Sequence, residues 1–109
     1  MKRLLFAGLA LSSAVPAFAG IDAAKAQAIA GQHMCLSCHA VDHKVVGPAY
    51  RDVAHKYKGD ADAMAALMKK VKGGGAGAWG PVAMPPNPGI SDADLQVVLT
   101  WVLAGAPTQ

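Results

Sequence analysis

The pentapeptide Cys35-Leu36-Ser37-Cys38-His39 constrains this chain more than any other stretch, because it gathers three strongly ligating side chains within five residues. The spacing C-x-x-C-H is typical of covalent haem attachment, in which the sulfurs of Cys35 and Cys38 form thioethers to the porphyrin and His39 ligates the iron. The pattern therefore predicts one covalently attached haem c, around which the rest of the chain must fold.

Three other kinds of site use a similar pair of cysteines. A thioredoxin-type redox site requires a βαβ context, and no β-branched run followed by a helical pattern lies near the motif. A zinc site needs four ligands, but the chain has no second cysteine pair, so His33, His43 or His55 would have to complete it. A structural disulfide leaves the histidine of the motif without a role. Each alternative explains fewer residues than haem attachment does.

Residues 1–19 have the pattern of a secretory signal peptide. Lys2 and Arg3 precede a short apolar run, and Ala17-Phe18-Ala19 has the small-x-small form of a cleavage signal. The run is too short to span a bilayer comfortably. We therefore expect cleavage before Gly20 and export to the periplasm, where both cysteines can be used for haem attachment.

The expected mature chain, residues 20–109, is one domain of 90 residues whose own apolar core is marginal. Loss of Lys2 and Arg3 lowers the formal charge from +3 to about +1, so charge gives little support for nucleic-acid or membrane binding. Both phenylalanines, Phe6 and Phe18, also leave with the leader. A covalently held haem would supply the large apolar body that the remaining sequence lacks.

Hydrophobic periodicity and capping residues predict an all-α fold with four helices and no convincing strand. The predicted helices are 22–31, capped by Asp22; 48–59, opened by Pro48 or Ala49; 60–73, capped by Asp60 and stopped by Gly73; and 91–105, capped by Ser91 with Asp94 in the capping-box position. Residues 73–89 are dominated by glycine and proline and predict an irregular loop. A loop of that length in a small domain is usually functional.

This loop does not have the features of a phosphate-binding P-loop, since no G-K-[ST] ending and no preceding strand are present. Its most useful residue is Met84, whose thioether is a soft neutral ligand that suits low-spin haem iron opposite a histidine. Met64 and Met68 have the helical spacing of core residues, and Met34 directly precedes the attachment motif. Met84 is therefore the candidate second ligand, with bis-histidine ligation as an alternative.

Together, these stretches resemble the class I cytochromes c, and within them the small bacterial cytochrome c-551 type. The likeness is carried by residues 35–40, 46–54 and 77–87 and by the helix around Trp101-Val102-Leu103. It implies a small single-domain fold in which about four helices wrap around one covalently attached haem.

The resemblance implies that Cys35 and Cys38 carry the thioethers and that His39 and Met84 are the axial iron ligands. The family commonly has proline immediately before the ligand methionine, whereas this chain has Ala83. The backbone before the methionine therefore has one restraint fewer than is usual in the family.

Four further residues have roles that the resemblance implies. Pro48 offers its carbonyl oxygen to the ring N–H of the ligand histidine. Trp79 directs its indole N–H at a buried haem propionate, and Asn87 donates a hydrogen bond to or near the methionine sulfur. Lys70 stands where the family often has an arginine for the same propionate, and it supplies the charge without the bidentate fork.

The predicted function is that of a soluble periplasmic one-electron carrier, not an enzyme, that alternates between Fe(III) and Fe(II). Its partners are expected to be respiratory redox proteins such as a terminal oxidase, a nitrite reductase or a peroxidase. We expect a monomer with no stable membrane insertion and no nucleic-acid partner. Apolar residues would surround the haem edge within a basic rim that steers acidic partners: Val45, Val46, Val82 and Ala83, with Lys25, Lys44, Lys69 and Lys72.

The alternative function is a haem-based ligand sensor or small peroxidase in which Met84 leaves the iron readily. The residue before it, Ala83, is the feature that favours this alternative. A peroxidase would want a positioned acid–base pair near the open site, and residues 73–89 contain no titratable side chain. The sequence therefore favours the carrier.

Overall fold

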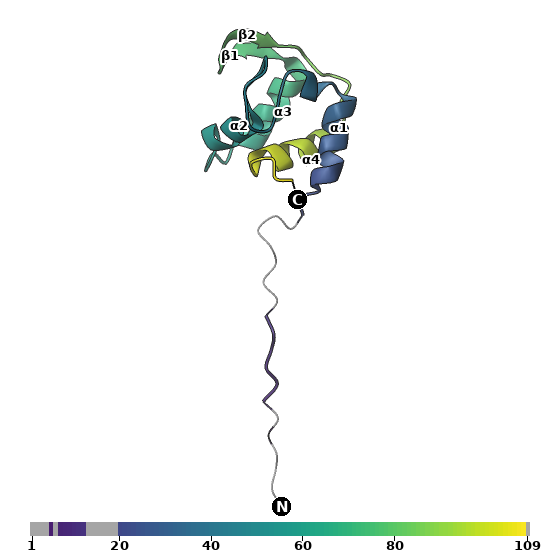
Figure 1. Ribbon diagram of the computed structural model, residues 1–109, viewed down its shortest axis with the longest axis vertical. Helices are drawn as coiled ribbons and strands as arrows, with labels where there is room; N and C mark the ends of the chain where they lie inside the picture. The colour runs from purple at the N-terminus through teal and green to yellow at the C-terminus, as the bar shows by residue number, and fades with distance from the viewer. Residues whose placement is uncertain (1–4, 6, 13–19, 109) are drawn as a thin grey trace, which may run out of the picture.

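The computed structural model describes residue 5, residues 7–12 and residues 20–108 (Figure 1). The predicted cleavage signal Ala17-Phe18-Ala19 lies outside the described residues, as does most of the predicted leader. The described leader residues form no helix or strand and are highly exposed, Leu9 at 88% for example. Within the ranges that the structure describes, no helix is long and apolar enough to cross a membrane.

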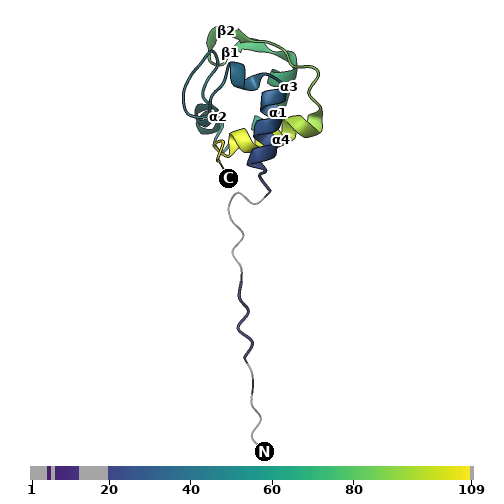
Figure 2. The same ribbon diagram turned by 45° about the vertical axis from the view of Figure 1, so that its right-hand side comes forward.

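The described body of the chain contains four α-helices, as the sequence predicts. They are α1 (Ala23–Gln32), α2 (Tyr50–Lys56), α3 (Ala63–Gly73) and α4 (Asp92–Leu103), and a 3-10 turn, η1 (Cys35–Ser37), follows α1. The last helix contacts each of the other three. Figure 2 shows α1 crossing in front of α4, with α2 on the left of the body and α3 behind the upper part of α1.

Two of the predicted helix caps are confirmed and one is wrong. Asp22 accepts a hydrogen bond from the backbone N–H of Lys25 (2.9 Å), and Ser91 accepts one from that of Asp94 (3.1 Å). The third helix begins at Ala63 and not directly after Asp60. The Asp60 carboxylate instead accepts from the N–H of Asp62 (2.8 Å), so it closes a turn that precedes the helix.

The prediction that residues 73–89 contain no strand is wrong. They form an antiparallel hairpin of β1 (Gly75–Gly77) and β2 (Gly80–Met84), with Gly75 opposite Met84 and Gly77 opposite Gly80. The three glycines have φ values of +129°, +113° and +110°, which side chains with a Cβ rarely adopt. Glycine thus permits a hairpin that lacks the β-branched alternation of an ordinary strand. The hairpin covers one end of the helical body (Figure 1).

The core is built on α4, whose Trp101 is the largest fully buried side chain. Its indole Nε1 donates a hydrogen bond to the carbonyl oxygen of Pro107 (2.8 Å). Ala26 and Ala30 of α1 have no exposed surface, and such small side chains let the two helices approach closely. Other buried members of the cluster are Ile29, Tyr50, Val53, Leu67, Ile90, Leu95, Val98, Leu99 and Val102.

Met64 and Met68 are partly buried and pack against this core. Their predicted role as core residues is confirmed. Met84, by contrast, lines a cavity, and Met34 is 68% exposed.

Candidate functional site

A cavity of about 360 Å³ lies between the attachment motif, the hairpin and the inner faces of α3 and α4. All eight residues singled out in the sequence line it: Cys35, Cys38, His39, Pro48, Lys70, Trp79, Met84 and Asn87. Most of the remaining lining is apolar and comes from the helical core and the hairpin. The structure therefore brings together residues from widely separated segments around one apolar space.

Cys35 begins the tight turn η1 shortly after α1, and Cys38 caps the end of that turn. Met34 opens this turn in the left-handed conformation (φ +61°), and the N–H groups of Cys38 and His39 both donate to the Cys35 carbonyl oxygen, at 3.2 and 2.9 Å. Both sulfurs are free thiols at the cavity wall. One turn of backbone thus presents two sulfurs and an imidazole to the same space.

The His39 ring is held by three neighbours. Its Nδ1 donates to the Pro48 carbonyl oxygen (2.7 Å), which can only accept, so the proton is on Nδ1 and the lone pair is on Nε2. The Tyr50 ring stacks on the imidazole, with centroids 5.1 Å apart and planes inclined by 20°. Gly47 is the third neighbour, and its Cα lies so close to the imidazole that a side chain at this position would overlap the ring. The imidazole is thereby fixed in tautomer and orientation with Nε2 available as a ligand.

Replacing Gly47 by alanine is expected to displace this ring. A Cβ at position 47 would overlap the imidazole and lie only 2.8 Å from Nδ1 of His39. We expect a loss of about 1–3 kcal/mol in the free energy of unfolding, as for other overpacked sites, and a shift of the His39 ring resonances in NMR spectra.

The matched control is Gly31→Ala in α1, where a Cβ meets no atom within 4 Å. That change is expected to leave the His39 resonances in place and to stabilise the helix slightly. Equal stability of the two variants with unmoved His39 resonances would contradict the close packing at Gly47.

Tyr50 joins the attachment turn to the core. Its hydroxyl lies beside the Cys35 thiol, and its ring meets that of Trp101 edge to face, with centroids 5.5 Å apart. Burial raises the pKa of the Cys35 thiol, and burial likewise raises the pKa of Tyr50 well above its usual range. The Tyr50 hydroxyl is therefore neutral at pH 7, which suits an apolar cavity wall.

Met84 reaches the cavity from the end of β2 and is partly buried. Asn87 lies just beyond it, and its side-chain amide donates to the Pro85 carbonyl oxygen (3.4 Å), next to Met84. The Asn87 backbone N–H donates to the carbonyl oxygen of Val71 at the end of α3 (2.8 Å). The methionine and histidine donors thus approach the same cavity from different segments of the chain.

Trp79 and Lys70 line the cavity near the hairpin. Trp79 lies at the hairpin turn and is 43% exposed, and the Nζ of Lys56 is 4.9 Å from the centroid of its ring. Lys56 also donates to the Ala78 carbonyl oxygen (3.3 Å), so α2 is tied to the hairpin at two points. Nothing in the sequence pattern pointed to Lys56, because a lysine on the polar face of a short helix is usually ordinary solvated surface.

The remaining histidines occupy different environments. His43 is exposed and pairs with Asp42 (2.9 Å), whose pKa is lowered by the hydrogen bond from that ring. His55 is exposed on α2. His33, by contrast, is partly buried and lines the cavity, whereas the sequence predicts an exposed or locally bonded side chain. In the described part of the chain, no cluster of three His, Cys, Asp or Glu side chains is arranged to hold a metal ion.

The family model for cytochrome c matches residues 23–105, which is most of the chain. The chain belongs to the cytochrome c family. Cytochromes c carry covalently attached haem, so haem c is the cofactor and Cys35 and Cys38 are its points of attachment. The cavity fits this group, because its lining is largely apolar, two free thiols share one wall, and an imidazole nitrogen and a thioether sulfur reach it.

Named relatives of this cytochrome include small bacterial proteins. Cytochrome c-551 of Pseudomonas aeruginosa is 51% identical over 70 residues, which are 64% of this chain and 66% of that protein, just under two thirds. Cytochrome c-552 of Nitrosomonas europaea is 45% identical over 98 residues, which are 90% of this chain and 89% of that protein.

Solved structures of cytochromes share the fold. The crystal structure of Nitrosomonas europaea cytochrome c552 aligns with a TM-score of 0.69 at 44% identity, covering 72% of this chain and 98% of that one. The class 1 cytochrome MtoD of Sideroxydans lithotrophicus aligns with a TM-score of 0.68 at 30% identity, covering 80% and 99%. The class I cytochrome c fold is therefore confirmed, and the chain is a small electron-transfer cytochrome.

Proposed function

We propose that this chain is a soluble periplasmic monohaem carrier of single electrons in which His39 and Met84 are the two axial iron ligands. The observation that supports this most is that the His39 ring, fixed through Pro48, and the Met84 thioether line the same apolar cavity. The haem, when bound, supplies the Fe(III)/Fe(II) couple. With both axial positions filled by protein, no substrate reaches the metal, so the proposed role is transfer and not catalysis.

The protein residues tune the couple through ligand type and burial. A histidine–methionine pair raises the reduction potential relative to more electron-rich ligand sets. Apolar side chains of α3 and α4 exclude water from the cavity and act in the same direction, because a less polar surrounding disfavours the more highly charged oxidised state. Trp79 and Lys70 are proposed to hold the haem propionates from the hairpin side, where both line the cavity.

Electron exchange is proposed to occur at an apolar surface beside the cavity. Val46 and Val82 line the cavity and are also 52% and 65% exposed, and Val45 next to them is 47% exposed. Transient redox contacts of this kind are small. The proposed partners are respiratory oxidoreductases such as a terminal oxidase, a nitrite reductase or a peroxidase, met by a monomer in the periplasm to which the leader pattern directs it.

The four lysines of the proposed basic rim differ in whether their charge is available to a partner. Lys25, Lys44 and Lys69 are exposed, whereas Lys72 forms an ion pair with Asp92. Steering of acidic partners therefore depends on the three exposed lysines and weakens as ionic strength rises.

Spectroscopy of the purified haem protein tests the ligand set. The oxidised protein is expected to show the weak near-infrared band (~695 nm) of methionine bound to ferric haem, and the reduced protein to bind carbon monoxide poorly. Absence of the band together with rapid carbon monoxide binding at neutral pH would instead support the alternative of a ligand sensor or small peroxidase with labile Met84. A colourless purified protein would carry no haem, and this would exclude both the electron carrier and the ligand sensor or peroxidase.

A further inference from the structure

We propose that the C-terminal end of α3, together with Gly74 that directly follows it, is the anchor that positions Met84 in the cavity. This inference rests on the proposed ligation of iron by Met84. It concerns the backbone that carries the ligand, and it assigns a positioning role to Gly74, which does not line the cavity itself.

Gly74 directly follows α3 and touches the backbone of the ligand segment. Its φ of +68° and ψ of −166° lie in a region open in practice only to glycine. A Cβ at this position would lie 2.6 Å from the Met84 carbonyl oxygen, 2.8 Å from the Pro86 nitrogen and 3.0 Å from the Pro85 carbonyl carbon. These are main-chain atoms that cannot rotate away. The segment from Met84 to Pro86 is therefore seated on a surface that exists because residue 74 has no side chain.

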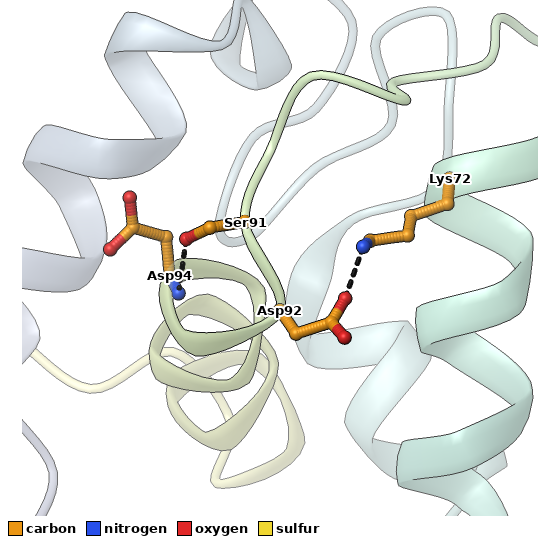
Figure 3. Close-up of polar contacts among 4 residues, drawn as sticks. All are labelled: Lys72, Ser91, Asp92 and Asp94. Carbon is orange, nitrogen blue, oxygen red and sulfur yellow. Dashed lines mark hydrogen bonds and ion pairs between the residues drawn. The ribbon is translucent and has the colours of Figure 1, made fainter.

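Two further contacts join the same turn of α3 to the chain beyond Met84. The carbonyl oxygen of Val71, which has no partner within the helix at this end, accepts the backbone N–H of Asn87 (2.8 Å). Lys72 forms an ion pair with Asp92 in the first turn of α4, and Figure 3 shows this pair bridging the two helices. The ligand segment and the chain that follows it are thus held at three points, by Val71 and Lys72 of α3 and by Gly74 directly after the helix.

The composition of the ligand segment explains why such an anchor is needed. Pro85 and Pro86 fix their own φ angles, so the backbone after Met84 is stiff and transmits the position of its anchor. The residue before Met84 is Ala83, which is exposed and provides no comparable restraint. Met84 is also paired with Gly75 across the hairpin, so the contact with Gly74 adds a restraint on the thioether from its C-terminal side.

The experiment compares three glycine-to-alanine variants of the full haem protein with Met84→Ala as the reference for ligand loss. Gly74→Ala introduces both the contact and the backbone strain. Gly73→Ala places the same methyl group one residue earlier, in helical backbone, where a Cβ meets no atom within 4 Å. Gly59→Ala introduces positive-φ strain (φ +78°) with no atom within 4 Å. The readouts are the ~695 nm band and the affinity of the ferric protein for added imidazole, which competes with the methionine.

We expect Gly74→Ala to weaken the band and to raise the imidazole affinity about tenfold or more, while Gly73→Ala and Gly59→Ala match the parent. If Gly74→Ala matches Gly73→Ala, the anchor is wrong although Met84 ligation stands. An equal effect of Gly59→Ala would also overturn the anchor, since strain alone would then suffice. An unchanged spectrum in Met84→Ala would overturn the proposed function itself.

A milder pair of variants keeps the proposal testable if Gly74→Ala yields no folded haem protein. Asp92→Asn and Asp94→Asn each remove one negative charge from the first turn of α4, but only Asp92 contacts Lys72; the Asp94 carboxylate points away from it (Figure 3). Asp92→Asn is expected to raise imidazole affinity by about twofold at low salt, as befits a partly exposed pair, and Asp94→Asn to leave it unchanged. Equal affinities in the two variants would overturn the anchor.

Discussion

Replacing Met84 by alanine is expected to abolish the ~695 nm band, open the iron to carbon monoxide and lower the reduction potential by more than about 100 mV, within the range of ~0.8 V that axial ligands control. The cause is loss of a soft thioether that favours the reduced iron. Water or an added ligand would then take the iron position that Met84 had held, and the protein would gain the ligand-binding reactivity that an electron carrier lacks.

The control for Met84→Ala is Met68→Leu, because Met68 is a partly buried core residue of similar volume. That change is expected to cost less than about 1.5 kcal/mol and to leave the spectrum unaltered. Potentiometric titration and carbon monoxide binding on both variants check the prediction. If Met84→Ala retains the band and Met68→Leu loses it, the ligand assignment is wrong.

The attachment side of the site was predictable because its chemistry is local in sequence. Cys35, Cys38 and His39 fall within one turn, so their spacing alone requires them to share a surface. The four helices were predictable for a similar reason, since periodicity and caps such as Ser91 act over three or four residues. The resemblance then placed Met84, Pro48 and the other lining residues, all of which reach one cavity.

The hairpin was not predictable from local pattern. Gly75, Gly77 and Gly80 lack side chains to show alternation, and their positive φ values are visible only in the folded backbone. The same limit applies to Gly47 and Gly74. A sequence shows that a glycine is present, but not which neighbour would meet its Cβ, because the His39 ring and the Met84 backbone approach these residues through tertiary packing.

Contacts between side chains that are far apart in the sequence were not predictable either. Lys56 over Trp79 joins residues 23 apart in the chain, and Lys72 with Asp92 joins residues 20 apart, with no spacing rule to link them. The sequence assigned Lys72 to a basic rim for partners, whereas the structure gives its charge an intramolecular partner. Such pairs follow from how α3 and α4 meet, which depends on the core.

That core depends most on Trp101, and Trp101→Ala is expected to lower the free energy of unfolding of the haem protein by about 3–5 kcal/mol. The side chain is 1% exposed, and the expected mature chain has no phenylalanine to fill the space. Since small domains are stable by only about 5–15 kcal/mol, this one change removes a large share. Guanidinium unfolding followed by absorbance of the haem measures it.

Two controls separate the causes of that loss. Trp101→Phe keeps an aromatic ring and removes the hydrogen bond to Pro107, for which we expect a cost of about 1 kcal/mol plus the smaller loss of packed volume. Thr100→Ala changes an exposed neighbour on the same helix and is expected to stay within about 0.5 kcal/mol of the parent. A Trp101→Ala variant as stable as Thr100→Ala would contradict the packing described for α4.

Removal of the Trp101 side chain is also expected to disturb the position of the His39 ring. The edge of Trp101 meets Tyr50, and Tyr50 in turn stacks on His39. Removing the indole takes away one of the two aromatic rings that pack against Tyr50. We therefore expect the His39 ring resonances to shift and broaden in Trp101→Ala but not in Thr100→Ala, because buried packing in this small domain holds the histidine in place.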